Sequence, residues 1–326
     1  MKAKLVFAVA VAICVTATDV KGELFQALHR GWYQPSGNEA NDANNANNAY
    51  FASTFAFNEF RNYFVFDRTD AQFAGKHVVS GTFDIQTDSS GTPNPTLNLF
   101  DFTGDVADLT AVAPTSGAAH YTDLGTGTGY GSSVLPNNTL QSIVLNTAAI
   151  NELRDNTIGG DFFVIGGAMA GAGQSKFFGT GGTFVTQLDL VLQTNLAPVS
   201  DPGGPYTIDP GFDLDLDGSA SADPDVALGD SIVSWEWDVD GDGTYDVTGE
   251  TTTVDWATLL GIGVLADNTY NLALRTTDEL GAQHVQTTLF TVNPVPEPAT
   301  CVIWALAGGS CGLAGWRRRR KAKAAA

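Results

Sequence analysis

The sequence predicts an all-β protein with two domains, flanked at both ends by targeting segments. Two observations predict this fold class. First, most apolar residues occur in short alternating runs that Gly, Asn, Asp and Pro interrupt, which is typical of strands joined by turns. Second, 43% of the residues are hydrophobic, so the chain can build packed cores although its formal net charge is −20.

Residues 1–17 have the layout of a secretory signal peptide. Lys2 and Lys4 precede an apolar stretch over residues 5–15, and Ala17 ends a short run that suits cleavage. We therefore expect an N-terminal signal helix and a mature chain that begins near Thr18.

Residues 18–195 are predicted to form the first domain, a jelly-roll-like β-sandwich. Four stretches alternate between apolar and polar positions as half-buried strands do: residues 60–67, 77–85, 96–102 and 184–192. Residues 142–156 instead place apolar residues on a loosely helical face, and they predict a helix that Gly159 and Gly160 close.

Residues 197–293 are predicted to form the second domain. Seven short strands can be read there: residues 206–208, 212–216, 232–239, 245–247, 251–256, 269–276 and 285–292. Seven strands in about a hundred residues is the count expected for an immunoglobulin-like β-sandwich. Alternation after residue 232 places Val233, Trp235, Trp237 and Val239 on one face, and we expect the two tryptophans to be core.

Four motifs of the second domain resemble those of PKD (polycystic kidney disease) domains. In chain order they are residues 203–206 (GGPY), 216–225 (LDGSASADPD), 235–243 (WEWDVDGDG) and 270–278 (YNLALRTTD). The resemblance covers nearly the whole domain. It implies an extracellular PKD-type β-sandwich that spaces domains, adheres or mediates contacts, and it does not imply catalysis.

Residues 295–326 form a tail of three parts. The motif Pro296-Glu297-Pro298 is followed by an apolar segment over residues 301–316 and a basic cluster over residues 317–323. As a helix the apolar segment would be about 24 Å long. We therefore expect a short transmembrane helix in a hydrocarbon core of about 30 Å. The basic cluster predicts that everything before the tail lies outside the cell.

The order of these parts resembles the PEP-CTERM sorting signal of Gram-negative bacteria. The resemblance implies that a membrane enzyme, an exosortase, recognises the Pro-Glu-Pro motif, removes the tail and delivers the rest to the cell surface or extracellular matrix. An ordinary C-terminal membrane anchor is the alternative, and it explains the helix and the arginines without the motif.

The part between the targeting segments is acidic and has no cysteine. Cys14, Cys301 and Cys311 all lie in the targeting segments, so we expect no disulfide or thiol chemistry in the mature protein. Eight of the 16 Lys and Arg residues also lie there, whereas nearly all of the 36 acidic residues do not. The resulting net charge, near −28, excludes nucleic acid as a partner and favours divalent cations.

Five aspartates of the second domain are candidate calcium ligands: Asp223, Asp225, Asp238, Asp240 and Asp242. The spacing of the last three, with a glycine after them, matches the first half of a calcium-binding loop. An EF-hand is excluded because position 12 is Gly249 and the flanks are strands. Two interpretations stay open: a PKD-type calcium site that joins Asp223 and Asp225 to Asp238 or Asp240, or turn-forming aspartates in a solvated acidic loop.

The sequence favours a surface or matrix protein that acts in adhesion or structural contacts, and it does not favour an enzyme. The four histidines are dispersed, and the sequence contains no paired-histidine motif and no nucleophile elbow. A carbohydrate-binding surface module is the alternative, and a glycoside-active enzyme is a less favoured one. The partners expected for the exported protein are exopolysaccharide or other surface proteins. The aromatic residues that could contact a glycan are Trp32, Tyr33, Tyr50, Tyr121 and Tyr130.

Overall fold

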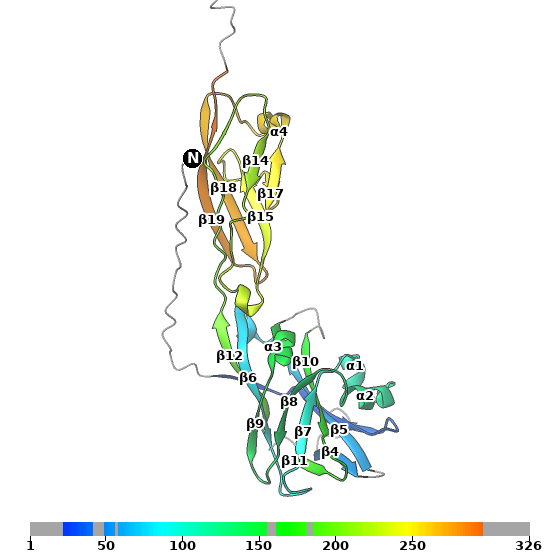
Figure 1. Cartoon of the computed structure of the whole chain (residues 1–326). Coiled ribbons are helices and arrows are strands. Elements are labelled where there is room, and N and C mark those ends of the chain that lie inside the picture. Colours follow the sequence, from blue (N-terminus) through cyan, green and yellow to red (C-terminus); the bar gives the residue numbers. More distant parts are fainter. Residues whose placement is uncertain (1–21, 42–48, 56–57, 155–160, 181–184, 296–326) are drawn as a thin grey trace, which may run out of the picture. The chain divides into compact units, whose positions relative to one another are not determined.

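The computed structural model describes residues 22–41, 49–55, 58–154, 161–180 and 185–295. The chain divides into two compact units, Met1–Asn195 and Leu196–Ala326. Both units consist mostly of strands, which confirms the all-β expectation (Figure 1). The signal segment, the Pro-Glu-Pro motif and the apolar segment of the tail lie outside the described residues. Among the helices that the structure describes, none is long and apolar enough to cross a membrane.

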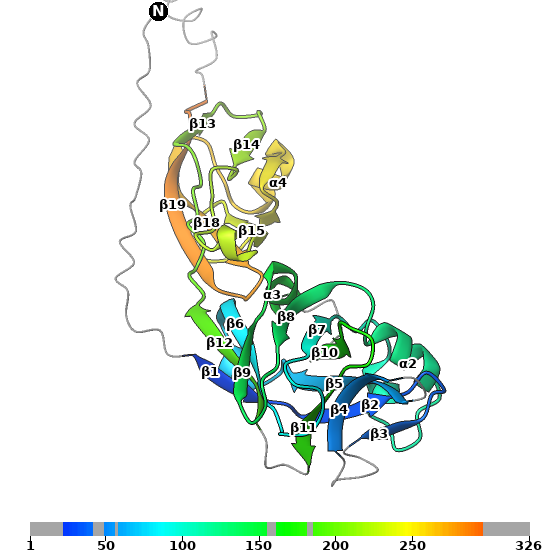
Figure 2. The ribbon, with the colours of Figure 1, turned by 60° about the horizontal axis from the view of Figure 1, so that its bottom comes forward.

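The first unit contains two sheets, which Figure 2 shows on either side of a common interior. The smaller sheet has the strand order β1 (Glu23–Gln26), β12 (Thr186–Thr194), β6 (Lys76–Gln86) and β9 (Leu140–Val144). The larger sheet has the order β11 (Ser175–Thr180), β4 (Ala49–Phe55), β5 (Asn58–Asp67), β10 (Phe162–Met169), β7 (Thr96–Phe100) and β8 (Gly129–Val134). Two further strands extend it, with β2 (His29–Tyr33) paired to β5 and β3 (Glu39–Asn41) paired to β2. The jelly-roll connectivity stays a prediction.

One apolar core fills the space between these sheets because alternation along each strand sends every second side chain inward. Phe83 of β6 packs against Phe64 and Phe66 of β5, with ring centroids 4.9 and 6.1 Å away. All three rings are buried. Aromatic pairs of this kind fix the two sheets face to face.

Short helices complete the first unit: the 3-10 helix η1 (Ala71–Phe73), α1 (Val106–Leu109), α2 (Gly117–Asp123) and α3 (Thr147–Arg154). α3 buries Ile150 and Leu153 in the main core. α1 and α2 cover a second apolar cluster on the outer face of the larger sheet. The hydroxyl of Tyr33 on β2 donates to the carbonyl of Leu109 at 2.7 Å, which anchors α1 to this sheet.

The second unit is also a sandwich of two sheets. The larger sheet has the order β13 (Tyr206–Ile208), β19 (Gln283–Val292), β18 (Asn268–Asp278), β15 (Ile232–Asp238) and β16 (Val247–Thr248). The smaller sheet pairs β14 (Leu214–Asp217) with β17 (Thr251–Val254). Two short helices join these strands, η2 (Val226–Leu228) and α4 (Trp256–Gly261). The seven expected strands are therefore all present. Trp237 lies in the core as expected, and Trp235 is partly buried against it. Val239 is buried in the same core.

Two local expectations are wrong. Val233 is 56% exposed and does not share the buried face of Trp237 and Val239. The pairing of β15 with β18 shifts between Ile232 and Ser234, and this bulge interrupts the alternation before Trp235. Residues 142–144 belong to β9, so the expected helix over residues 142–156 begins only at Thr147. Gly159 and Gly160, which should close that helix, lie outside the described residues.

Candidate functional site

The aspartates of the second unit form two separate clusters. Cluster A consists of Asp223, Asp230 and Asp278, and cluster B consists of Asp238, Asp240 and Asp246. In each cluster, one carboxylate oxygen from every residue lies within 4.8 Å of the corresponding oxygens of the other two. The two clusters lie at opposite ends of β15, a strand of seven residues. This length separates them by about 20 Å.

Cluster A forms where the antiparallel strands β15 and β18 meet. Ile232 at the start of β15 pairs with Asp278 at the end of β18, so Asp230 lies close to Asp278. Asp223 lies in the segment after β14. The residue before it, Ala222, forms an isolated antiparallel β-bridge with Val199. The three aspartates are buried, with exposed fractions of 8% for Asp223, 4% for Asp230 and 1% for Asp278.

The carboxylate of Asp223 is only half satisfied. Its Oδ1 atom accepts the N–H of Asp225 at 2.7 Å, and its Oδ2 atom is buried without a hydrogen-bond partner. Asp230 and Asp278 accept N–H groups from the turns that follow them. Burial raises the pKa of Asp223, and the nearby charges of Asp230 and Asp278 raise it further. The site is therefore a buried set of carboxylate oxygens that includes the unsatisfied Oδ2 atom of Asp223.

Cluster B lies at the end of β15 and in the loop that leads to β16, and its carboxylates fold that loop. The two oxygens of Asp238 accept the N–H groups of Gly241 at 2.8 Å and Gly243 at 2.9 Å. Asp240 accepts from Asp242, and Asp246 accepts from Val239 at 2.8 Å. Burial raises the pKa of Asp246, and the charges of neighbouring aspartates add to this shift.

The structure does not bring the five predicted ligands together. Asp223 belongs to cluster A, and Asp225 lies beside it, where its Oδ2 atom accepts the N–H of Leu196 at 2.7 Å. Asp238 and Asp240 belong to cluster B, and Asp242 lies next to them in the same loop, where it accepts the N–H of Thr244. The expected grouping of Asp223 and Asp225 with Asp238 or Asp240 is replaced by two groups.

Three aspartates of these clusters were missed in the sequence: Asp230, Asp246 and Asp278. Asp278 could have been found by pairing the expected strands 232–239 and 269–276 in antiparallel order, since the end of one then meets the start of the other. Asp230 would have followed, because it lies just before the first of these strands. No spacing rule singles out Asp246.

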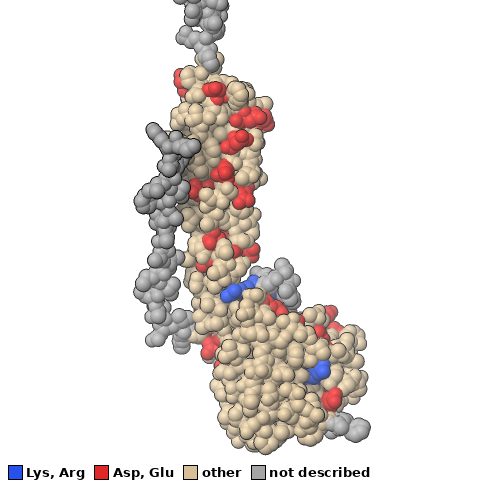
Figure 3. All heavy atoms as spheres, viewed as in Figure 1, with Lys and Arg blue, Asp and Glu red and all other residues tan. Residues whose placement is uncertain are grey.

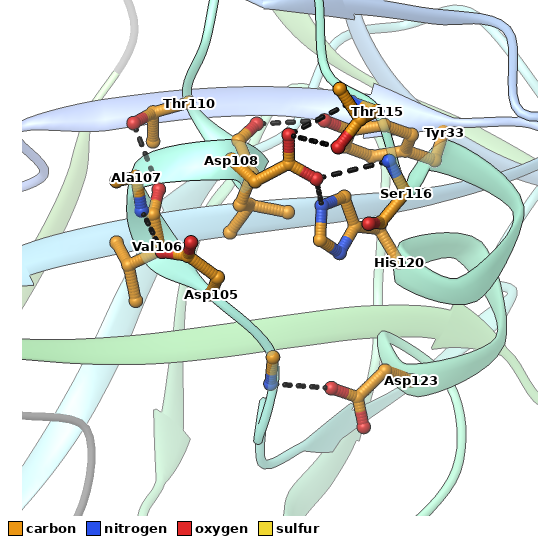
Figure 4. Close-up of polar contacts among 12 residues, drawn as sticks. Tyr33, Asp105, Val106, Ala107, Asp108, Thr110, Thr115, Ser116, His120 and Asp123 are labelled. Carbon is orange, nitrogen blue, oxygen red and sulfur yellow. Dashed lines mark hydrogen bonds and ion pairs between the residues drawn. The ribbon is translucent and has the colours of Figure 1, made fainter.

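A hollow of about 730 Å³ lies beside α1 and α2 in the first unit, and it is lined by Asp105, Asp108, Ser116, His120 and Asp123 among others. Figure 4 shows His120 and Asp108 in contact, with 2.9 Å between the imidazole Nε2 and the carboxylate. The backbone N–H of Thr115 also bonds Asp108 and is the main cause of its lowered pKa. These contacts fix the loop between the helices and leave a polar, acceptor-rich surface.

The five aromatic candidates for glycan contact divide into distinct groups. Tyr33 and Tyr130 are buried, so they belong to the core. Trp32 packs edge-on against Phe60, and Tyr121 donates to Glu59 and lies under the guanidinium of Arg61. These two side chains are half-buried. The side chain of Tyr50 lies outside the described residues.

Acidic side chains are spread over the face of the second unit that Figure 3 shows. Arg275 is the only basic residue between residues 197 and 293. It pairs with Glu236 at 2.7 Å and lies over the ring of Tyr245, so it does not neutralise either aspartate cluster directly.

The structure thus shows two β-sandwich units, the second of which carries two clusters of aspartates. The family model of the PEP-CTERM protein-sorting motif matches residues 294–321. The chain therefore carries this sorting signal, and the motif indicates a surface protein that an exosortase sorts. The comparison with curated proteins gives no match.

Several solved structures resemble parts of the chain. The PKD1 domain of Vibrio anguillarum Epp is 23% identical, with 31% of this chain and 99% of that chain covered and a TM-score of 0.23. The PKD1 domain from Vibrio cholerae metalloprotease PrtV is 22% identical, with 30% and 99% covered and a TM-score of 0.22. The adhesin domain of Epf from Streptococcus pyogenes is 7% identical, with 85% and 94% covered and a TM-score of 0.27. PKD domains are thus among the structural neighbours, and similarity at this level carries no information on ligands or activity.

Proposed function

We propose that this protein is an exported component of the cell surface or extracellular matrix that acts in adhesion or structural contacts. The observation that carries the proposal is the PEP-CTERM motif at residues 294–321. The two β-sandwich units support it, because such units present loops and sheet faces on a rigid scaffold. An exosortase would recognise Pro296-Glu297-Pro298 and remove the tail after the apolar segment had held the protein in the membrane.

Mass spectrometry of the C-terminal peptide tests this proposal. The protein is recovered from the cell-surface and matrix fraction, and the last peptide of the chain is identified. We expect the peptide to end near the Pro-Glu-Pro motif. A chain that still ends at Ala326 in that fraction would contradict sorting and would make the tail a permanent anchor. A strain without the exosortase serves as the control and should retain the tail.

We further propose that cluster A binds one calcium ion. Carboxylate oxygens are the ligands that calcium prefers, and the free Oδ2 atom of buried Asp223 gives the ion a place that the protein itself does not fill. An ion there would also offset the repulsion among three buried carboxylates. Asp225 lies next to the cluster and would keep its contact with Leu196.

A thermal melt tests calcium binding on the exported protein. We expect the unfolding temperature of the second unit to rise between a chelator and millimolar calcium, because an ion that binds only the folded state stabilises it. Equilibrium dialysis should then show one bound calcium per chain. A melt that is the same in both conditions would contradict the proposal, whereas the sorting proposal would be unaffected.

A non-catalytic role is part of the proposal. The ring of His120 bonds the carboxylate of Asp108, a contact that fixes the loop between α1 and α2. A carbohydrate-binding role remains the second candidate, because the hollow beside α1 and α2 presents carboxylates that could accept bonds from sugar hydroxyls. Retention on a column of the organism's own exopolysaccharide would support it. Asp123→Ala should then reduce retention, and flow-through of the unchanged protein would remove this candidate.

A further inference from the structure

Lys176 on β11 is a buried lysine with an unusual environment. None of its surface is exposed. Within the described part of the chain, the single hydrogen bond of its Nζ atom goes to the side-chain oxygen of Asn137, and no carboxylate lies within ion-pair distance. A buried ammonium without a charged partner is costly. Burial lowers the pKa of Lys176, and the charge of Asp88 offsets only part of this effect.

Asn137 is held against Lys176 by a network of fixed contacts. It lies in the turn between β8 and β9, where the buried hydroxyl of Thr87 donates to the carbonyl of Pro136 and accepts the N–H of Thr139 at 3.0 Å. The next residue, Asp88, donates its N–H to the carbonyl of Phe177 at 3.0 Å. Residues 87 and 88 therefore tie the turn that carries Asn137 to the strand that carries Lys176.

We propose that Lys176 and Asn137 condense in the folded protein to form an intramolecular isopeptide bond. The contact with the Oδ1 atom places the amine next to the carboxamide carbon, which is bonded to that oxygen. The neutral amine attacks this carbon, the new bond joins Nζ to Cγ, and the bond from Cγ to Nδ2 breaks. One amine proton moves to the departing group, which leaves as ammonia, so no oxidant or further reactant is needed.

This link would join the two sheets of the first unit. β11 belongs to the larger sheet, and the turn with Asn137 leads into β9 of the smaller sheet. The residues are 39 positions apart, so the link would close a long loop and restrict the unfolded chain as a disulfide does. A disulfide is not available here because every cysteine lies in a targeting segment.

Peptide mass spectrometry of the protein from the cell surface tests the proposal directly. Trypsin cleaves after a free lysine and not after an acylated one, so a linked protein should lack the linear peptide of residues 155–176. Digestion with a second protease should yield a branched peptide that contains Asn137 and Lys176. Its mass should equal the sum of the two linear peptides less one ammonia, about 17 Da.

Two variants provide the controls. In Asn137→Ala the linear peptide of residues 155–176 should appear in full amount. If that variant fails to fold, Lys176→Met keeps a long side chain of similar volume at this buried position, and the peptide with Asn137 should then be linear. Linear peptides at their sequence masses in the unchanged, folded protein would overturn the proposal, and so would a glycan on Asn137.

Discussion

Clusters A and B contain the same kind of side chain and differ in what those side chains do. In cluster B, Asp238 gives both of its oxygens to N–H groups of its own loop. In cluster A, Asp223 keeps one buried oxygen without a partner. Cluster B therefore uses its carboxylates to fold a turn, whereas cluster A holds an acceptor that the chain does not use.

This difference separates the two interpretations that the sequence left open. Turn-forming aspartates need no ion, since backbone N–H groups stabilise their negative charge. Three buried carboxylates repel each other when charged, and a bound cation would relieve that repulsion. The proposed calcium site and the turn-forming aspartates are therefore assigned to opposite ends of β15, and the predictions below test this assignment.

The largest expected effect is the loss of calcium stabilisation on changing cluster A. At a calcium concentration 100 times the dissociation constant, we expect about 2.7 kcal/mol of added stability in the unchanged protein. Asp223→Asn should remove most of this gain, because the amide replaces a charged ligand. Chemical unfolding followed by tryptophan fluorescence, with buried Trp237 as the reporter, measures the effect.

The matched control for this experiment is Asp240→Asn in cluster B. It removes one charge from the other aspartate cluster, but it should leave the calcium gain intact. An equal loss of calcium stabilisation in both variants would show that a diffuse acidic surface, and not cluster A, attracts the ion.

The next effect is a loss of stability that does not depend on calcium. Asp238→Ala removes the acceptor of two N–H groups in the loop, so we expect a cost of about 2 kcal/mol with or without calcium. Asp242→Ala in the same loop is the control. Its side chain is exposed and accepts one local bond, so its cost should stay within about 0.5 kcal/mol. Similar costs for the two variants would argue against the loop-folding role of cluster B.

Much of the second unit could be predicted from the sequence because its strands alternate regularly. Seven strands were expected and seven are present, with small shifts at their ends. The failure at Val233 has a local cause, since a bulge depends on how β15 pairs with β18 and not on the alternation itself. The helix expected over residues 142–156 failed at its start for a related reason. Ile143 fits a helical face and a strand equally well, and its pairing with Phe83 of β6 decides between them.

The candidate site was less predictable than the fold. Asp223 was found through its motif, but its partners Asp230 and Asp278 are 7 and 55 positions further along the chain and meet it only through strand pairing. The contact between Lys176 and Asn137 had no signal in the sequence, because neither residue belongs to a motif that pairs them. Local patterns predict which segments form strands, whereas sites of this kind depend on which strand ends meet.

The smallest expected effect concerns pH in the absence of calcium. The pKa of Asp223 is raised above its usual value of 3.8, so the folded state binds this proton more tightly than the unfolded state. The contribution of Asp223 to stability therefore falls as the pH rises through the raised pKa. Asn cannot titrate, so in chelator Asp223→Asn should be more stable than the unchanged protein by about 1 kcal/mol at neutral pH. This advantage should fade as the pH falls toward about 4.

Asp217→Asn is the control with the opposite sign, because hydrogen bonds from Ser219 lower the pKa of Asp217 and favour its charged form. If the stability difference between Asp223→Asn and the unchanged protein did not depend on pH, the negative charge of Asp223 would not be its cause.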